Sequence, residues 1–308
     1  KKVNIIYLNS SKIIFSIYKL FPLLLKVDKS ILISSITPLN CLLSFLKIFV
    51  PKHKLLLMQH EIPSLEFGSK KKLKRLIPVI MKILYKNADS IICVSNGLKS
   101  EIIDLLGQKN KEKIEVIYNL TSIKKDVSNK NNFRLKRNLS EKNLIKILSI
   151  GRLDKSKNFI SLIKAFCLLK KDVNSRLTIV GSGPDEFKIK RYIKDLNVSK
   201  YINLIPFTND IKKYYEESDI YVSSSIYESF GNTIVEAMHF GLHIVATDCP
   251  YGPKEICENG KYGYIAKTNS FSDLYEKLQI CIKLNLLPDY TANLERFSEA
   301  SILKKFFN

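Results

Sequence analysis

The stretch SSIYESFGNTIVEAM occupies residues 224–238 and follows the short apolar run Ile220–Ser223. The run has the length of a buried strand, and the residues from Thr233 to His239 have the periodicity of a helix. The stretch therefore predicts a strand, a loop and a helix in succession. Glu228 lies in the predicted loop, and Glu236 lies about one turn into the helix. Backbone amides between them would be exposed at the start of the helix, where the helix dipole favours an anion such as a phosphate.

Two carboxylates around an anion site indicate a ligand that also carries neutral hydroxyl groups, as a sugar does. A structural interpretation stays open, in which Glu228 is a helix cap and Glu236 is an exposed helix residue. The predicted apolar face of this helix contains Ile234, Val235 and Met238, which leaves Glu236 directed elsewhere.

Short apolar runs alternate with helix-period segments along the whole chain, which is typical of parallel α/β folds. In the first half we expect strands at Val3–Leu8, Ile31–Ser35, Lys54–Gln59, Ser90–Ser95 and Lys113–Tyr118. In the second half we expect strands at Ile145–Ser149, Arg176–Val180, Ile202–Ile205, Ile220–Ser223 and His243–Ala246. Helices between the strands complete two Rossmann-like, doubly wound domains that face each other across a cleft. Ligands of such folds bind beyond the carboxyl ends of the strands.

Two other strand-to-helix junctions carry candidate binding groups. The segment GRLDKSKN at residues 151–158 begins with Gly151, which allows a tight exit from the strand. Arg152 and Lys157 would place two cations at a helix N-terminus, which suits a pyrophosphate, although a lysine-rich surface loop is an alternative. In VGSGPD, residues 180–185, Gly181 and Gly183 would let the backbone approach a ligand. This turn lacks the GxGxxG spacing and the acidic residue of a dinucleotide site, which argues against a nicotinamide enzyme.

Together these segments resemble the retaining glycosyltransferases of family 4, which have the GT-B fold. Glu228 and Glu236 form the E-x7-E pattern of that family, and DCPYGPKEICENGKYGYI follows at residues 248–265. Upstream, LYKNADSIICVSNGLKSEI and KIEVIYN are similar to the end of the family's acceptor domain. The resemblance extends from about Ile31 to the last residue.

The resemblance implies a role for each charged residue. Arg152 and Lys157 would neutralise the donor diphosphate, and Glu236 would bind the ribose hydroxyls. Glu228 would hold the transferred sugar and its phosphate. The backbone amides expected to assist Glu228 are those of Phe230, Gly231 and Asn232.

Further donor contacts are implied at Gly151, Gly181 and Gly183, and near Phe207, where the backbone of residues 205–207 would meet the base. His60, in the segment QHEIP, matches the family's active-site histidine, although a lone histidine after an apolar run is more often structural. The catalytic set expected from the resemblance is His60, Glu228, Arg152 and Lys157.

The implied reaction is a front-side, oxocarbenium-like displacement with retention, and no nucleophile is identified. It needs no cofactor and no metal, because cations and helix amides stabilise the charge on the leaving phosphate. The expected donor is a UDP-hexose or UDP-N-acetylhexosamine, and the expected acceptor is a lipid-linked or growing surface glycan.

We expect four regions along the chain. Residues 1–120 would form the acceptor-side domain, 121–140 a linker and 141–292 the nucleotide-sugar domain. Residues 293–308 would form an amphipathic helix that packs back on the first domain. No glycine-rich loop precedes Val3–Leu8, so we expect some tens of residues of the family's fold to be missing at the start. A truncated remnant that binds nucleotide without turnover is the alternative function.

Charge is strongly uneven. Residues 1–140 contain 26 Lys and Arg against 9 Asp and Glu, whereas residues 141–308 contain 24 against 20. A basic half indicates an anionic partner, and we expect an anionic membrane surface, although the cluster KKKLKR at 70–75 could be an ordinary solvated helix face. Nucleic acid is not expected, because aromatic residues do not interleave the basic clusters. We expect a cytoplasmic protein, with the inner face of the cell membrane as a second location.

Two compositional alternatives are weaker. Residues 31–50 are almost long enough for a membrane span, but Pro38 and Asn40 favour a strand, a turn and a helix. The six cysteines form no CxxC pair, so we expect reduced core residues and no structural zinc.

Overall fold

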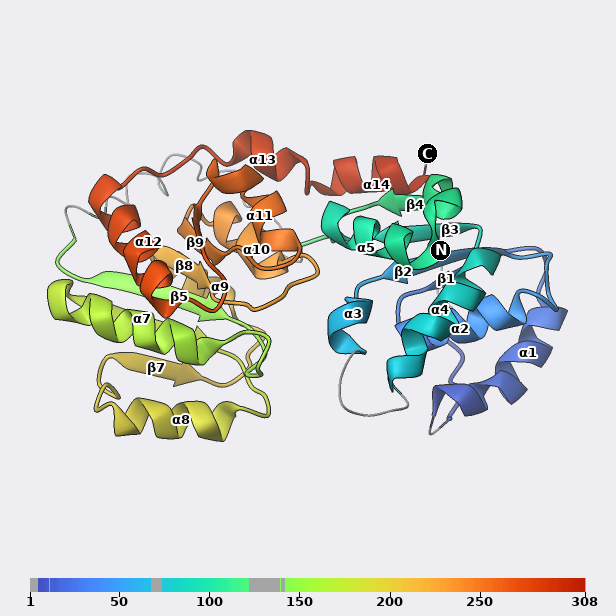
Figure 1. The fold of residues 1–308 in the computed structure, drawn as a ribbon, viewed down its shortest axis with the longest axis horizontal. Coiled ribbons are helices and arrows are strands. Elements are labelled where there is room, and N and C mark those ends of the chain that lie inside the picture. The colour runs from blue at the N-terminus through green and yellow to red at the C-terminus, as the bar shows by residue number, and fades with distance from the viewer. Residues whose placement is uncertain (1–4, 11, 68–73, 122–138, 140–141, 308) are drawn as a thin grey trace. The chain divides into compact units, whose positions relative to one another are not determined.

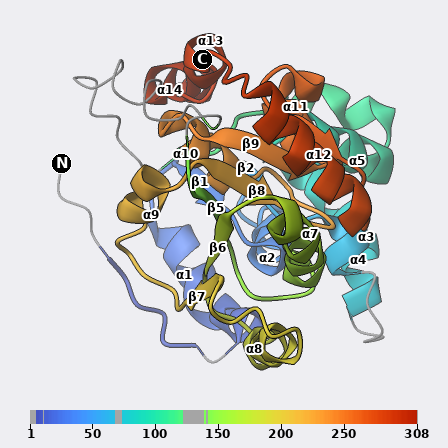
Figure 2. The same cartoon turned by 90° about the vertical axis from the view of Figure 1, so that its left-hand side faces the viewer.

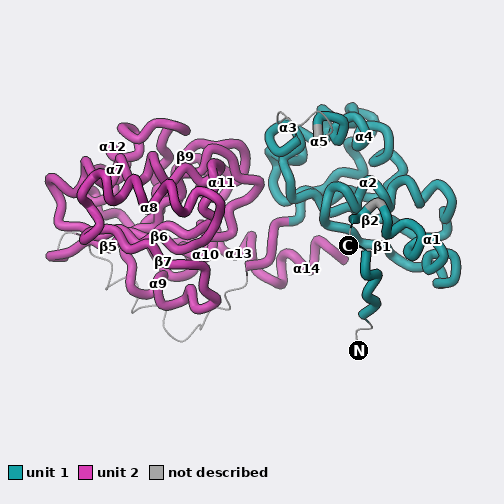
Figure 3. The backbone as a smooth tube through the Cα atoms, turned by 90° about the horizontal axis from the view of Figure 1, so that it is seen from below, with its two compact units in different colours: residues 1–117 teal, residues 118–308 magenta. Residues whose placement is uncertain are grey.

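The computed structural model describes residues 5–10, 12–67, 74–121, 139 and 142–307. The chain divides into two compact units, residues 1–117 and 118–308, which Figure 3 colours separately. The predicted linker at 121–140 and the basic cluster at 70–75 lie mostly outside the described residues.

Unit 1 is built around four parallel strands in the order β1-β2-β3-β4 (Figure 1). Alternate residues of β2 are buried, and Leu55 and Leu57 are fully enclosed, because this strand is central and covered by helices. Pro38 stands in the first turn of α2, where it costs no hydrogen bond. The elements of unit 1 are η1 (Ile13–Ser16), α1 (Ile17–Lys26), β1 (Ile31–Ser34), α2 (Thr37–Leu46), β2 (Lys54–Gln59), α3 (Pro63–Glu66), η2 (Lys74–Leu76), α4 (Ile77–Leu84), η3 (Tyr85–Asn87), β3 (Ser90–Cys93), α5 (Asn96–Leu106), η4 (Gln108–Lys113) and β4 (Ile114–Val116).

The predicted strand at Val3–Leu8 is wrong over its described residues. Ile5, Ile6 and Tyr7 are 69%, 63% and 78% exposed, and residues 5–10 are not in a strand. An apolar run becomes a strand only beside another strand edge that satisfies its backbone groups, and no described strand pairs with these residues.

Unit 2 is a six-stranded parallel sheet in the order β10-β9-β8-β5-β6-β7. Figure 2 shows α7 and α12 on one side of this sheet and α9 and α10 on the other. Apolar residues of α7 and α12, such as Phe166 and Leu278, share one core with the strands. The elements of unit 2 are β5 (Ile145–Ile150), α7 (Phe159–Asp172), β6 (Ser175–Val180), α8 (Glu186–Asp195), β7 (Ile202–Ile205), α9 (Lys212–Glu217), β8 (Ile220–Ser223), α10 (Asn232–His239), β9 (His243–Thr247), α11 (Gly252–Ile256), η7 (Glu258–Gly260), β10 (Tyr264–Ala266), α12 (Phe271–Leu284), α13 (Thr291–Glu295) and α14 (Glu299–Phe307).

The predicted single helix at the end of the chain is also wrong. Two helices, α13 and α14, occupy this segment. The side chain of Ser298 accepts a hydrogen bond from the amide of Ser301 at 3.2 Å, which caps a new helix. Packing of this segment on the first domain stays a prediction.

Residues 31–50 fold as the predicted strand, turn and helix. None of the helices in the described part of the chain has both the length and the apolar character that crossing a membrane requires. The six cysteines are free thiols, and all except Cys167 are buried.

Candidate active site

The candidate site lies at the switch point of the unit 2 sheet. Strand β5 borders β6 on one side and β8 on the other, so the chain leaves β5 and β8 at the same edge and in different directions. A parallel sheet opens a crevice at this point, beyond the carboxyl ends of its strands. Both predicted phosphate-binding segments, 151–158 and 224–232, begin here.

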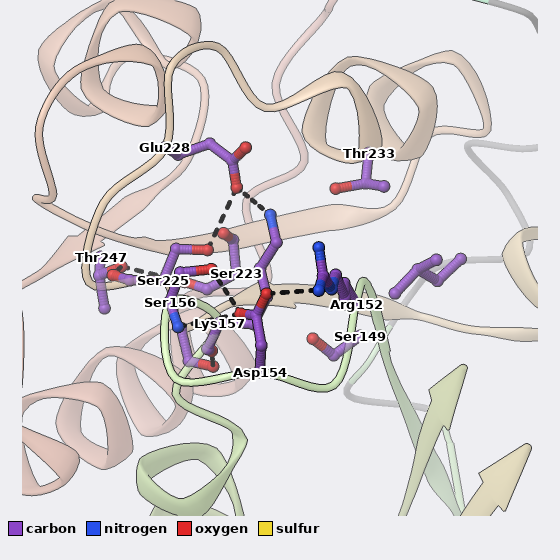
Figure 4. Close-up of polar contacts among 12 residues, drawn as sticks. Ser149, Arg152, Asp154, Ser156, Lys157, Ser223, Ser225, Glu228, Thr233 and Thr247 are labelled. Carbon is purple, nitrogen blue, oxygen red and sulfur yellow. Dashed lines mark hydrogen bonds and ion pairs between the residues drawn. The ribbon is translucent and has the colours of Figure 1, made fainter. Parts of the chain in front are cut away.

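Lys157 and Glu228 meet across this point (Figure 4). The ammonium of Lys157 donates to Oε2 of Glu228, and the two side chains are only 22% and 19% exposed. Ser225 also donates to Oε2 of Glu228, at 3.3 Å. The hydroxyl of Ser224 donates a 2.7 Å hydrogen bond to the carbonyl of Lys157. The loop after β8 therefore fixes the backbone of Lys157. The structure therefore brings together two residues that lie 71 positions apart.

Arg152 is placed differently. Its side chain is 72% exposed, and its Nε lies 3.5 Å from Oδ2 of Asp154. The other carboxylate oxygen of Asp154 accepts from the amide and the hydroxyl of Ser156, at 2.9 and 2.6 Å. These bonds shape the loop, whereas an ion pair this exposed contributes little to stability. Arg152 thus keeps a largely solvated guanidinium beside the site.

A small polar pocket lies between these loops, and sequence reasoning missed most of its lining. The hydroxyl of Tyr221 donates to Oγ1 of Thr233 at 2.6 Å, and the hydroxyl of Thr247 donates to the carbonyl of Ser225 at 2.6 Å. The serine run at 223–225, directly after a buried strand, was the available signal. The pocket is lined by Ser149, Ile150, Lys157, Phe159, Tyr221, Ser223, Ser224, Ser225 and Thr233.

The glycines of the predicted donor loops serve the packing of the protein itself. A Cβ on Gly181 would lie 1.9 Å from the carbonyl oxygen of Gly151, and one on Gly183 would lie 2.5 Å from that of Leu153. The two loops also continue the sheet, since the amide of Leu153 donates to Ser182 at 3.0 Å. Close contact between the loops therefore requires these glycines, whether or not a ligand is bound.

The N-terminus of α10 is open. Gly231 has φ of 115° and no side chain caps the helix, so its first amides face the loop region. Asn232 is exposed and accepts a hydrogen bond from Asn119 at 3.2 Å. The ring of Phe230 is 2% exposed and stacks on Tyr118, with centroids 5.5 Å apart. The side chain of Phe230 therefore belongs to the packed interior, and the predicted role of its amide stays a prediction.

The loop that carries Glu228 is fastened to the segment after β9. The amide of Glu228 donates to the carbonyl of Pro250 at 2.6 Å, and its carbonyl accepts from Tyr251 at 2.8 Å. A Cβ on Gly252 would lie 1.6 Å from the carbonyl oxygen of Phe230. The conformation of the glutamate loop thus depends on the later YGP segment.

Glu236 is buried, at 7% exposure, and is not directed away from the packed side of its helix as the sequence indicated. Tyr215, which sequence reasoning missed, donates a 2.8 Å hydrogen bond to its Oε2. Burial raises the pKa of Glu236, and the bond from Tyr215 partly offsets this. The tyrosine fixes one oxygen of the carboxylate.

Phe207 and His60 complete the predicted set. Phe207 is 71% exposed, and its amide donates to the hydroxyl oxygen of Ser182 at 3.0 Å. His60 belongs to unit 1, where it follows β2. Its neighbour Gln59 is fixed by bonds to Thr37 at 3.2 Å and to the carbonyl of Glu61 at 2.7 Å. Burial lowers the pKa of His60, although Glu61 acts in the opposite direction.

Within the described ranges, no group of three His, Cys, Asp or Glu side chains gathers as metal ligands.

The family profile described as "Glycosyl transferases group 1" matches residues 130–301. The chain belongs to this family. An uncharacterized glycosyltransferase of Haemophilus influenzae is 36% identical over 157 residues, which are 51% of this chain and 44% of the relative. A second relative, N-acetylgalactosamine-N,N'-diacetylbacillosaminyl-diphospho-undecaprenol 4-alpha-N-acetylgalactosaminyltransferase of Campylobacter jejuni, is 26% identical over 211 residues, covering 66% of this chain and 53% of the relative.

This group 1 chain spans about half the length of these curated relatives. Its structure is similar to that of Anabaena HepE in complex with UDP, with a TM-score of 0.74, 20% identity, and coverage of 95% of this chain and 80% of the other. The likeness confirms the predicted GT-B fold of two Rossmann-like units.

Proposed function

We propose that this group 1 chain transfers a hexose or N-acetylhexosamine from a UDP-sugar to a lipid-linked or growing surface glycan, with retention, as the family 4 resemblance implies. The observation that carries the proposal is the contact of Lys157 with Glu228 beside the open N-terminus of α10. A cation and free amides suit a diphosphate, and a carboxylate beside them suits sugar hydroxyls.

In the proposed complex, Lys157 and Arg152 bind the diphosphate together with the amides of Phe230, Gly231 and Asn232. Negative charge grows on the leaving phosphate in the transition state, so these groups act most strongly there. Chemistry of this kind needs no metal ion.

The carboxylates of Glu236 and Glu228 each bind hydroxyl groups of a different part of the donor. Glu236 accepts from the ribose with the oxygen that Tyr215 leaves available, and Glu228 accepts from the sugar. The loops at Gly151, Gly181 and Gly183 border the donor, and the backbone beside Phe207 meets the base. The family resemblance also implies a part in the transfer step for His60.

Names of similar proteins support the donor and acceptor classes. HepE of Anabaena was crystallised in complex with UDP, and the Campylobacter jejuni relative is named for a diphospho-undecaprenol acceptor and an alpha linkage. We further propose that the enzyme acts in the cytoplasm or at the inner face of the cell membrane, without a nucleic-acid partner.

The test is a thermal titration of the purified chain with UDP, GDP and ADP, followed by a transfer assay with UDP-sugars and a polyprenyl-diphosphate glycan. The proposal expects UDP to stabilise the chain most and a glycosylated lipid to form. Stabilisation by UDP without transfer or donor hydrolysis would indicate the nucleotide-binding remnant instead. A cooperative melt that no nucleotide shifts would contradict both.

A further inference from the structure

The first two residues of unit 2, Tyr118 and Asn119, contact the loop to which we assign the donor phosphates. Tyr118 is 9% exposed, and its ring stacks on that of Phe230, with centroids 5.5 Å apart and planes 25° apart. Nδ2 of Asn119 donates to Oδ1 of Asn232 at 3.2 Å, and Asn232 is the first residue of α10. Two neighbouring residues therefore hold both ends of the segment 230–232.

Phe297, just after α13, completes a cluster of three rings with Tyr118 and Phe230. It is 2% exposed, and it meets the ring of Tyr118 at 5.1 Å and that of Phe230 at 5.6 Å, edge to face in both cases. Aromatic pairs in such arrangements contribute more than the area that they bury. Two rings thus fix the side chain of Phe230, whose backbone belongs to the loop.

Polar contacts fix the ring of Tyr118 in turn. Its hydroxyl donates to Oε1 of Glu255 on α11 at 2.7 Å and accepts from the guanidinium of Arg296 at 3.1 Å. The same guanidinium donates to Oε1 of Glu258 at 2.9 Å. Burial and the bond to Glu255 raise the pKa of Tyr118, although Arg296 acts in the opposite direction. The phenol therefore keeps the proton that it donates.

The loop depends on such support because of Gly231. Its φ of 115° lies in the region that favours glycine, and a residue without a side chain does little to fix the backbone around it. A Cβ on Gly231 would lie 3.4 Å from the side chain of Ile256 on α11. Asn293, which is 1% exposed, donates to the carbonyl of Ile256 at 2.9 Å. Helix α11, held by Tyr118 and Asn293, therefore also borders the loop.

We propose that Tyr118 and Asn119 are positioning residues of the donor site, which hold the backbone amides of residues 230–232 in the arrangement that binds the diphosphate. This role rests on the proposed function, which gives these amides their ligand. The strength of a hydrogen bond depends on its distance and angle, and a misplacement of about 1 Å at a reacting site can cost roughly 100-fold in rate. Tyr118 acts through the ring of Phe230, and Asn119 acts through Asn232.

The test compares the Kd of UDP with that of uridine, which has the same base and ribose but no phosphate. Tyr118→Leu removes the ring stack and should weaken UDP by roughly tenfold or more, whereas uridine should bind within about twofold of its wild-type affinity. Tyr118→Phe keeps the ring and should bind UDP within about threefold of wild type. Calorimetry measures the Kd of UDP, and ligand-observed NMR measures that of uridine.

Two further variants separate positioning from stability. Phe166 is fully buried in α7, on the other side of the unit 2 sheet from α10 (Figure 2). Phe166→Leu should lower the Tm through a cavity and leave the ratio of the uridine Kd to the UDP Kd within about twofold. Asn119→Ala changes a half-buried side chain outside the ring cluster and should lower that ratio by roughly threefold. All titrations are made at a temperature at which circular dichroism shows each variant to be folded.

With a wild-type chain that binds UDP, three results would overturn the positioning role. They are an unchanged ratio in Asn119→Ala and in folded Tyr118→Leu, equal weakening of UDP by Tyr118→Leu and Tyr118→Phe, and an equal fall of the ratio in Phe166→Leu. Where Tyr118→Leu does not fold, the ratio in Asn119→Ala decides alone. A folded wild-type chain that does not bind UDP would contradict the proposed function itself, and the positioning role with it.

Discussion

Replacing Lys157 with methionine removes one of the two cations of the site and keeps most of the volume of the side chain. A hydrogen bond to a charged group contributes about 1.5–3 kcal/mol, so the loss of this contact to a diphosphate should weaken UDP binding by roughly 10- to 150-fold. At UDP about 100 times the wild-type Kd, ligand binding stabilises the native state by about 2.7 kcal/mol, and a 30-fold weaker Kd would leave about 0.9 kcal/mol. For a unit of this size, the shift in Tm would fall from about 5–10 °C to about 2–4 °C.

Glu228→Gln is the matched control, because it breaks the same ion pair and keeps the cation. Both variants should lower the Tm of the free protein, but Glu228→Gln should retain the UDP shift and lose part of the additional shift given by a UDP-sugar. Calorimetric Kd values for UDP check the comparison. If both variants weaken UDP equally, or if neither does, the contact between Lys157 and Glu228 is structural and the reasoning fails.

Three further changes test other parts of the site. Glu236→Gln should bind UDP more weakly. The raised pKa of Glu236 makes its ionisation unfavourable in the folded state, so the stability of the wild type should fall relative to that of the variant as the pH rises above the ordinary pKa of glutamate. Urea unfolding of both proteins at pH 4 and pH 7 measures this difference. Gly181→Ala should lower the free energy of unfolding by about 2 kcal/mol or more through overlap with the carbonyl of Gly151, whereas Gly260→Ala, also at positive φ but with open space around it, should cost about 1 kcal/mol. His60→Ala should leave the UDP shift unchanged and abolish transfer, measured as UDP release with acceptor.

Each of these has a clear contrary result. A parallel pH dependence of stability in Glu236→Gln and wild type would mean that the carboxylate is not penalised by burial. Equal costs at Gly181 and Gly260 would remove the packing argument for the donor loops. A loss of the UDP shift in His60→Ala would indicate a structural histidine.

Five strands of unit 2 were predictable because each is a short apolar run between turn signals, and β7 and β8 begin and end where the sequence indicated. Strand β10 was missed, because it is only three residues long. Val3–Leu8 has the same local character, yet Ile5–Leu8 is not a strand. The local sequence does not explain this difference. The backbone groups of a strand need hydrogen-bond partners on the edge of a neighbouring strand, and the periodicity of a sequence carries no information about that neighbour.

Some features of the candidate site were likewise visible in the sequence, and others depend on the fold. The spacing of Glu228 and Glu236 is visible in the sequence, and so is the cation at Lys157. Tyr215 was not identified, because its contact with Glu236 spans 21 positions and a lone tyrosine on a short helix carries no motif. The packing of Gly181 and Gly183 was not visible in the sequence for a related reason, since a close approach between two loops can be recognised only when both are placed.

The contact between Lys157 and Glu228 need not be broken for a donor to bind. An ammonium group can donate three hydrogen bonds, so Lys157 can hold Glu228 and still reach phosphate oxygens. The carboxylate likewise keeps acceptor positions for hydroxyl groups. In the free protein the charge of Glu228 offsets part of the charge of Lys157, so Arg152 and the amides of α10 add to the attraction for an anionic diphosphate. Both groups would stabilise the negative charge that develops on the leaving phosphate. The ion pair then serves to hold cation and carboxylate at a fixed separation, which is what simultaneous binding of a phosphate and its attached sugar requires.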